Sequence, residues 1–126
     1  MTNHTVLYIE DYEDNLLLVE RLFRRRPDIQ LRCARTGRDG VRAAADDPPG
    51  LILLDNHLPD GDGKQVLRQL ASVPATAAIP VVIVSGDSAH EAIDEILAAG
   101  AVGYLTKPFD IHDFLAILDR YLGEGR

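Results

Sequence analysis

Cysteine and tryptophan are almost missing from this chain of 126 residues, which has one cysteine and no tryptophan. The single Cys33 cannot form an internal disulfide, and its apolar neighbours predict a small buried side chain. No apolar run approaches the roughly 20 residues of a membrane-spanning helix, and the first residues lack the long apolar core of a signal peptide. We therefore expect a cytoplasmic protein without direct membrane contact.

Positive charge is also scarce, since 13 Lys and Arg face 20 Asp and Glu, for a net charge of -7. An acidic surface repels phosphate groups, which argues against nucleic acid as a partner. The basic triplet Arg24 to Arg26 falls in the last turn of a predicted helix, where the helix dipole favours solvated cations. Length and composition are those of one globular domain spanning residues 1–126.

Short apolar runs alternate with helical patterns along the chain. Unbroken runs suit strands buried on both faces, and the weaker second run suits a strand near an edge. The runs cover residues 6–9, 29–34, 51–54, 81–84 and 101–105. Helical spacing follows each run, with start signals at Thr36 with Asp39, Ser88 with Glu91, and Asp110, and a stop at Gly100. The pattern predicts a doubly wound α/β domain, with helices on both faces of a five-stranded parallel sheet. We take the flavodoxin-like strand order 2-1-3-4-5 as the hypothesis for this sheet.

Polar residues stand at the ends of four of these runs. Glu10 and Asp11 follow the first, and Asp55 follows the third. In the order 2-1-3-4-5 these two strands are neighbours, so the three carboxylates converge at the sheet edge where ligands bind. Ser85 and Lys107 arrive at the same edge from the fourth and fifth strands.

This set of residues predicts a phosphoryl-transfer site. Three carboxylates in one crevice repel one another, and Mg²⁺ relieves that repulsion with hard oxygen ligands. A lysine ammonium and a serine hydroxyl add the groups that hold a phosphoryl group as it moves onto a carboxylate oxygen. Taken alone, Asp55 is also compatible with a residue that only opens a turn.

Four segments carry a resemblance to a known family: VLYIEDYEDN, LILLDNHLPDGDG, IPVVIVSGDS and GAVGYLTKPF, in this order. The chain resembles, essentially from end to end, a response regulator receiver domain of the CheY-like superfamily in bacterial two-component signalling. The resemblance implies that Asp55 is the phosphoacceptor. It also implies an Mg²⁺ site formed by Glu10, Asp11, Asp55 and the backbone carbonyl of His57.

The resemblance assigns three further residues. Ser85 takes the switch hydroxyl position, Tyr104 the aromatic switch position, and Lys107 the family's lysine, followed by a cis bond to Pro108. The chain departs from the family pattern at Glu10, where many members have aspartate, and at Gly86, where alanine is common. His57 and Asp87 occupy positions that tune phosphoryl lifetime in the family.

The implied function is a switch rather than an enzyme. A sensor histidine kinase or a histidine phosphotransfer domain would supply the phosphoryl group to Asp55, and the acyl phosphate would later be lost to water. Ser85 and Tyr104 would then change the face made by the fourth helix, fifth strand and fifth helix. With only Gly123 to Arg126 after the last predicted helix, we expect a stand-alone regulator or the receiver part of a hybrid histidine kinase, as a monomer or weak homodimer.

Several alternatives share parts of this pattern. A haloacid-dehalogenase-type phosphohydrolase uses a second aspartate two residues after its nucleophile, and His57 stands there. A flavin or nucleotide module would need a phosphate-binding loop where residues 10–14 are acidic, and a calcium loop would need oxygen ligands where His57 and Pro59 stand. A receiver that binds partners without phosphorylation remains the main alternative.

Overall fold

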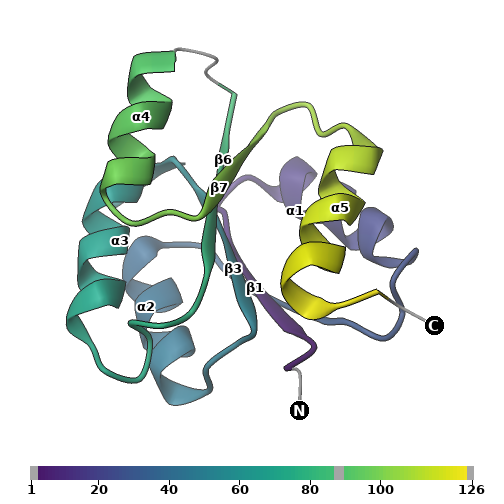
Figure 1. Cartoon of the computed structure of the whole chain (residues 1–126), viewed down its shortest axis with the longest axis horizontal. Coiled ribbons are helices and arrows are strands. Elements are labelled where there is room, and N and C mark those ends of the chain that lie inside the picture. Colours follow the sequence, from purple (N-terminus) through teal and green to yellow (C-terminus); the bar gives the residue numbers. More distant parts are fainter. Residues whose placement is uncertain (1–2, 87–89, 125–126) are drawn as a thin grey trace.

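A parallel sheet of five strands forms the middle layer of the fold (Figure 1). The computed structural model describes residues 3–86 and 90–124. The strands of this sheet are β1 (Thr5–Ile9), β2 (Gln30–Ala34), β3 (Leu51–Asp55), β6 (Val81–Ser85) and β7 (Gly103–Thr106). Their order is β2-β1-β3-β6-β7, and every neighbouring pair is parallel. The predicted fold class and strand order are confirmed.

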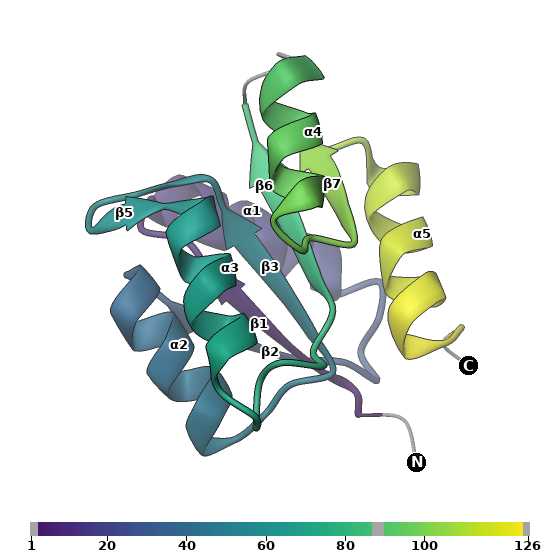
Figure 2. The ribbon, with the colours of Figure 1, turned by 60° about the vertical axis from the view of Figure 1, so that its left-hand side comes forward.

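Helices cover both faces of the sheet, and Figures 1 and 2 show the two layers from different sides. One layer contains α1 (Glu13–Phe23) and α5 (Ile111–Leu122), and the other contains α2 (Gly37–Asp46), α3 (Gly63–Ser72) and α4 (His90–Ala98). Alternate strand residues serve the two layers, so Leu51 and Leu53 of β3 join one core cluster while Ile52 and Leu54 join the other. None of the described helices is long and apolar enough to span a membrane.

Capping residues begin three of the helices. Thr36 Oγ1 accepts from the Asp39 amide at 3.0 Å, and Asp110 Oδ1 accepts from the amides of His112 and Asp113, as predicted. A reciprocal capping box between Asp62 and Gln65 begins α3 and was not predicted. The predicted pair Ser88 with Glu91 lies outside the residues whose side chains the structure describes.

A short antiparallel hairpin follows β3, in a segment that the sequence predicts only as a turn. It consists of β4 (His57–Leu58) and β5 (Gly61–Asp62). Gly61 has a φ of 153°, a conformation that favours glycine. The hairpin leads directly into α3, so it sets where the chain goes after Asp55.

Two predicted side-chain environments are wrong. Cys33 is exposed, because β2 is the edge strand and its residues are only partly covered. Arg26 is buried instead of solvated: its guanidinium pairs with Asp28 and Asp119, both at 2.8 Å, and donates to the Gly123 carbonyl at 2.8 Å. Arg26 therefore ties the end of α1 to the end of α5. Arg24 and Arg25 are exposed, as predicted.

Candidate functional site

Three carboxylates gather where β1 and β3 end. The two strands pair directly, with Ile9 opposite Leu54, so Glu10 and Asp55 reach the same edge of the sheet. One oxygen from each of Glu10, Asp11 and Asp55 lies within 4.8 Å of the others. Glu10 is 1% exposed and Asp55 4%, whereas Asp11 is exposed. The predicted convergence of the three carboxylates is confirmed.

Lys107 places a cation against two of these carboxylates. Its Nζ donates to Glu10 Oε1 at 2.8 Å and to Asp55 Oδ1 at 3.2 Å. The side chain comes from the loop after β7, and the Lys107 amide donates to the Ser85 carbonyl at 2.9 Å. The peptide bond to Pro108 is cis, as the resemblance implies.

Two residues that sequence reasoning missed hold Glu10 from other sides. The Tyr8 hydroxyl donates to Glu10 Oε1 at 3.0 Å, and Asn15 Nδ2 donates to the same oxygen at 2.9 Å. The signal for Tyr8 was present, because residues two apart in a strand point to the same side and a buried tyrosine hydroxyl needs a partner. Asn15 reaches the site from the first turns of α1.

The two buried carboxyls have pKa values that move in opposite directions. The pKa of Asp55 is raised to about 6, first because the carboxyl is buried and second because the Glu10 carboxyl is next to it, although Lys107 acts against both. Burial also acts to raise the pKa of Glu10, but hydrogen bonds with Lys107 and Asp55 hold it below its usual value. Contact with both carboxylates raises the pKa of Lys107 despite its burial.

The donor set of this cluster suits a divalent cation with a preference for hard oxygen ligands. Its three carboxylates outnumber its one ammonium, and one of the three, Asp11, is open to solvent. Mg²⁺ binds such sites through one or two carboxylates together with waters and phosphate oxygens. The residues present therefore fit Mg²⁺.

The other predicted site residues are Ser85, Tyr104 and His57, and they lie outside the carboxylate cluster itself. Ser85 ends β6 and is 5% exposed, and its strand pairs with β3 so that Asp55 faces Val84. Tyr104, in the edge strand β7, is 38% exposed and lines a hollow of about 410 Å³ with Ile117 of α5. The His57 side chain is exposed in the hairpin after Asp55. The structure thus gathers Glu10, Asp11, Asp55 and Lys107 directly, with Ser85 at the same edge.

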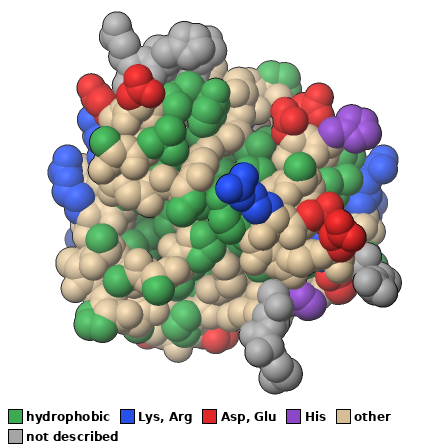
Figure 3. Space-filling view, viewed as in Figure 1, with side chains coloured by type: hydrophobic (Ala, Val, Ile, Leu, Met, Phe, Trp, Pro, Cys, Tyr) green, Lys and Arg blue, Asp and Glu red, His purple; other side chains and the backbone are tan. Residues whose placement is uncertain are grey.

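Apolar side chains are exposed on the face formed by α4, β7 and α5, which we call the α4–β7–α5 face. Leu97, Val102 and Tyr104 are 42%, 46% and 38% exposed. Figure 3, in the orientation of Figure 1, shows hydrophobic side chains at the surface on this side of the molecule. This is the face at which the resemblance to receiver domains implies a change of shape.

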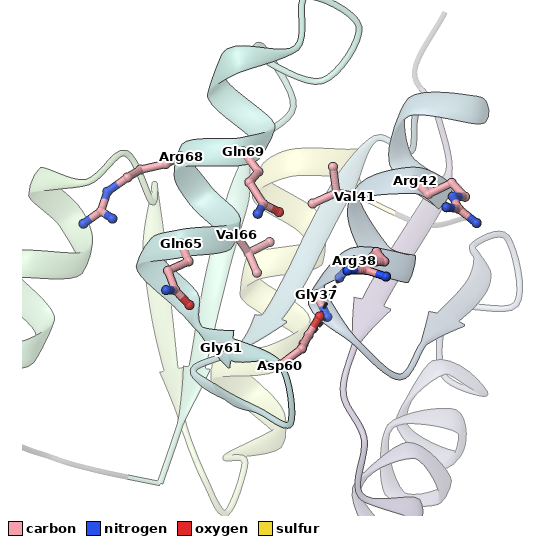
Figure 4. A pocket seen from close by; sticks show the side chains of 10 residues that line it. All are labelled: Gly37, Arg38, Val41, Arg42, Asp60, Gly61, Gln65, Val66, Arg68 and Gln69. Carbon is pink, nitrogen blue, oxygen red and sulfur yellow. Dashed lines mark hydrogen bonds between the residues drawn. The ribbon is translucent and has the colours of Figure 1, made fainter.

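A separate groove of about 600 Å³ lies between α2 and α3 (Figure 4). Asp60 at its edge accepts from the amides of Gly37 and Arg38 at 2.8 and 3.0 Å, which makes it a structural cap of α2. None of the clustered carboxylates lines this groove. The groove is therefore distinct from the candidate site.

Comparison with known proteins gives a consistent result. Residues 6–119 match the family model described as "Response regulator receiver domain". The transcriptional regulatory protein KdpE of Mycobacterium tuberculosis is 35% identical over 114 residues, which is 90% of this chain and 49% of that protein. The polar-differentiation response regulator DivK of Brucella ovis is 28% identical over 96% of this chain and 98% of its own length. The chain spans about half or less of the length of several other curated relatives.

Solved structures share the fold over nearly the whole chain. The receiver domain of the sensor histidine kinase PA1611 from Pseudomonas aeruginosa, solved with a magnesium ion coordinated in its active site cleft, has a TM-score of 0.85 and 25% identity. That match covers 97% of this chain and 99% of the other. The chemotaxis response regulator CheY4 of Vibrio cholerae has the same TM-score at 23% identity, which shows the fold alone.

Proposed function

Because this chain belongs to the response regulator receiver family, we propose that Asp55 accepts a phosphoryl group from a phosphohistidine and so switches a protein-binding face. The observation that carries the proposal is the surroundings of Asp55. Its carboxylate is buried, lies within 4.8 Å of Glu10 and Asp11 oxygens, and accepts a hydrogen bond from Lys107. The phosphoryl donor is a sensor histidine kinase or a histidine phosphotransfer domain.

In the transfer step, an Asp55 carboxylate oxygen attacks the phosphorus atom. A new oxygen–phosphorus bond forms while the phosphorus–nitrogen bond of the phosphohistidine breaks, and the electron pair leaves with the imidazole nitrogen. Lys107 donates to a phosphoryl oxygen, which it can reach because its Nζ already contacts Asp55 at 3.2 Å. Attack of water on phosphorus later releases inorganic phosphate and restores the carboxylate.

Glu10, Asp11, Asp55 and the His57 backbone carbonyl are the residues that we assign to Mg²⁺. The clustering of the three carboxylates supports this assignment, as does the magnesium ion in the related receiver domain of PA1611. When bound, the ion offsets the negative charge that accumulates as the phosphoryl group approaches the carboxylates.

The output of the switch is a change at the α4–β7–α5 face. We assign Ser85 to bond a phosphoryl oxygen on phosphorylated Asp55, and Tyr104 to turn inward in response. The position of Ser85 at the end of β6 and the half-exposed ring of Tyr104 in the neighbouring strand support these roles. The target of the face is a protein, and we expect no nucleic acid contact from this acidic domain.

The remaining expectations concern the whole chain. We propose that residues 1–126 form one receiver domain, active as a monomer or weak homodimer in the cytoplasm. The domain is either a complete regulator or a part of a longer protein such as a hybrid histidine kinase. The match to DivK covers 98% of that protein, and the match to PA1611 is to the receiver domain of a sensor histidine kinase.

Intact mass spectrometry tests the proposal directly. The protein is incubated with acetyl phosphate in the presence of Mg²⁺ or of a chelator, beside the variants Asp55→Asn and Asp46→Asn. Asp46 is a matched control, because it is an exposed aspartate at the end of α2. We expect one added phosphoryl group on the wild type and on Asp46→Asn, dependent on Mg²⁺, and none on Asp55→Asn. A folded wild type that gains no phosphoryl group would instead be a phosphorylation-independent binding domain.

A further inference from the structure

Tyr8 is a buried residue of the candidate site that the proposed function does not use. It lies in the middle of β1 with 0% exposure, inside the core cluster that α1 and α5 cover. A phenylalanine would fill the same apolar space without a hydroxyl group that has to be hydrogen-bonded. The Tyr8 hydroxyl donates to Glu10 Oε1 at 3.0 Å, so its hydrogen bond goes to a residue of the candidate cation site.

The hydrogen bonds of Glu10 are distributed unevenly between its two oxygens. Oε1 accepts from Tyr8, Asn15 and Lys107 at 3.0, 2.9 and 2.8 Å. Among the donors that the described residues offer to Glu10, the one on Oε2 is the Tyr12 amide, at a long distance of 3.4 Å. A carboxylate oxygen has about two lone-pair positions. Three donors therefore occupy Oε1 fully, and Oε2 is the oxygen that retains capacity for a cation or its water.

We propose that Tyr8 is a positioning residue for cation binding, which acts by fixing the orientation of the Glu10 carboxylate. Tyr8 and Glu10 are two residues apart, and the strand directs both side chains to one side. The longer side chain of glutamate matters, because an aspartate at position 10 would end one methylene short of the Tyr8 hydroxyl. Tyr8 and Glu10 are therefore a matched pair.

Water cannot replace Tyr8 as it can replace the other donors. Lys107 and Asn15 are both partly exposed, so a solvent molecule can enter where either side chain withdraws. Tyr8 is enclosed in the core. This inference rests on the proposed function in one respect: once Lys107 turns to a phosphoryl group, Oε1 of Glu10 loses one of its three donors, and Tyr8 still holds it.

The test is a double-mutant cycle read by Mg²⁺ affinity. The unphosphorylated wild type, Tyr8→Phe, Glu10→Asp and the double variant are titrated with MgCl₂, and amide chemical shifts give each dissociation constant. We expect Tyr8→Phe to weaken Mg²⁺ binding about 10-fold, as is usual for a residue that orients a metal ligand. In the Glu10→Asp background, where the tyrosine has no carboxylate to reach, the same change should alter affinity less than about twofold.

Tyr121→Phe is the matched control, since its hydroxyl contacts the Val102 carbonyl at 3.4 Å and lies outside the carboxylate cluster. Unchanged affinity in Tyr8→Phe, an equal loss in both backgrounds, or a wild type that binds no Mg²⁺ would each overturn the inference. Failure of the proposed function would have a different signature. Asp55 would then remain unphosphorylated while Tyr8→Phe still weakened Mg²⁺ binding.

Discussion

At the scale of single residues, the site places two carboxylates that repel each other, Glu10 and Asp55, in a buried position. Asp55 has a pKa of about 6 in the folded protein, and an exposed aspartate has a pKa near 4. Between these two pH values Asp55 is therefore protonated more fully in the folded protein than in the unfolded chain. The contribution of Asp55 to the free energy of unfolding falls as pH rises through this window, and its full destabilisation is present above pH 6.

Removing the charge of Asp55 should accordingly stabilise the cation-free protein. We expect Asp55→Asn to raise the free energy of unfolding at pH 7 by roughly 1–3 kcal/mol, with the gain disappearing toward pH 4. Urea unfolding in the presence of a chelator at both pH values measures this difference. The control variant Asp46→Asn should show no such gain. A variant less stable than the wild type at pH 7 would mean that Lys107 outweighs both burial and Glu10.

Arg26 gives a second prediction at this scale. Its guanidinium is nearly enclosed, whereas Asp28 and Asp119 keep 26% and 45% of their side-chain exposure, so water can solvate these carboxylates after the arginine is removed. We expect Arg26→Met to lower the free energy of unfolding by roughly 1–3 kcal/mol, below the usual cost of breaking a fully buried pair. Thermal unfolding beside the exposed neighbour Arg25→Met measures this, and equal effects of the two changes would contradict the role of Arg26.

The roles of Arg26 and Tyr8 were missed for one physical reason: each depends on a polar contact that the residue pattern does not show. Glu10, Asp11, Asp55 and Lys107 could be placed because parallel strands bring their carboxyl ends to one edge. Arg26 could not, because its partner Asp119 is 93 positions away and a basic triplet looks the same whether it is solvated or paired. Tyr8 lies in an apolar run, so its ring was interpreted as part of the core. The hydrogen bond from its hydroxyl to Glu10 was therefore not predicted.

At the scale of elements, α2 approaches β1 so closely at Gly40 that a larger residue there would contact Ile9. A Cβ added to Gly40 would lie 2.4 Å from Ile9 Cδ1. Helix propensity favours alanine over glycine by about 1 kcal/mol, so propensity and packing predict opposite signs. We expect packing to dominate and Gly40→Ala to destabilise the protein by roughly 1–3 kcal/mol.

The matched comparison for this prediction is Gly103→Ala, because a Cβ there would meet nothing within 4 Å. Chemical denaturation of both variants gives the free energy of unfolding of each. It shows whether the added Cβ costs more at Gly40, where it meets Ile9, than at Gly103, where it meets nothing. A Gly40→Ala variant that is more stable than the wild type would mean that α2 can move away from β1 without a loss of packing energy.

The ends of helices could be predicted where a capping side chain is present in the sequence. Thr36 and Asp110 were identified as caps because the sequence signal and the contact are local. The hairpin of β4 and β5 was missed, since two residues per strand leave no periodicity to recognise. The first helix begins at Glu13, two residues before the start predicted near Asn15, and no side chain caps it. The last strand covers Gly103–Thr106 rather than residues 101–105, because its pairing with β6 begins at Gly103.

At the scale of the whole molecule, two neighbouring strands connect the site to the α4–β7–α5 face. Ser85 pairs with Thr106 and Ile83 with Tyr104, and the Lys107 amide donates to the Ser85 carbonyl at 2.9 Å. Backbone hydrogen bonds therefore connect the end of β6 to β7 and to Lys107. This geometry gives the proposed switch a continuous physical connection, and that connection can be tested.

We expect Ser85→Ala to separate phosphorylation from its response. The variant retains Lys107 and the three carboxylates, Asp55 among them, so acetyl phosphate with Mg²⁺ should still phosphorylate it. Without the hydroxyl, the amide resonances of Val102, Tyr104 and Ile117 should shift by less than half as much as in the phosphorylated wild type. Ser72→Ala is the control, because that hydroxyl donates to the Gln69 carbonyl within α3. A complete shift in phosphorylated Ser85→Ala would show that the α4–β7–α5 face responds to the phosphoryl group without Ser85, and Lys107 would then be the residue that transmits the change.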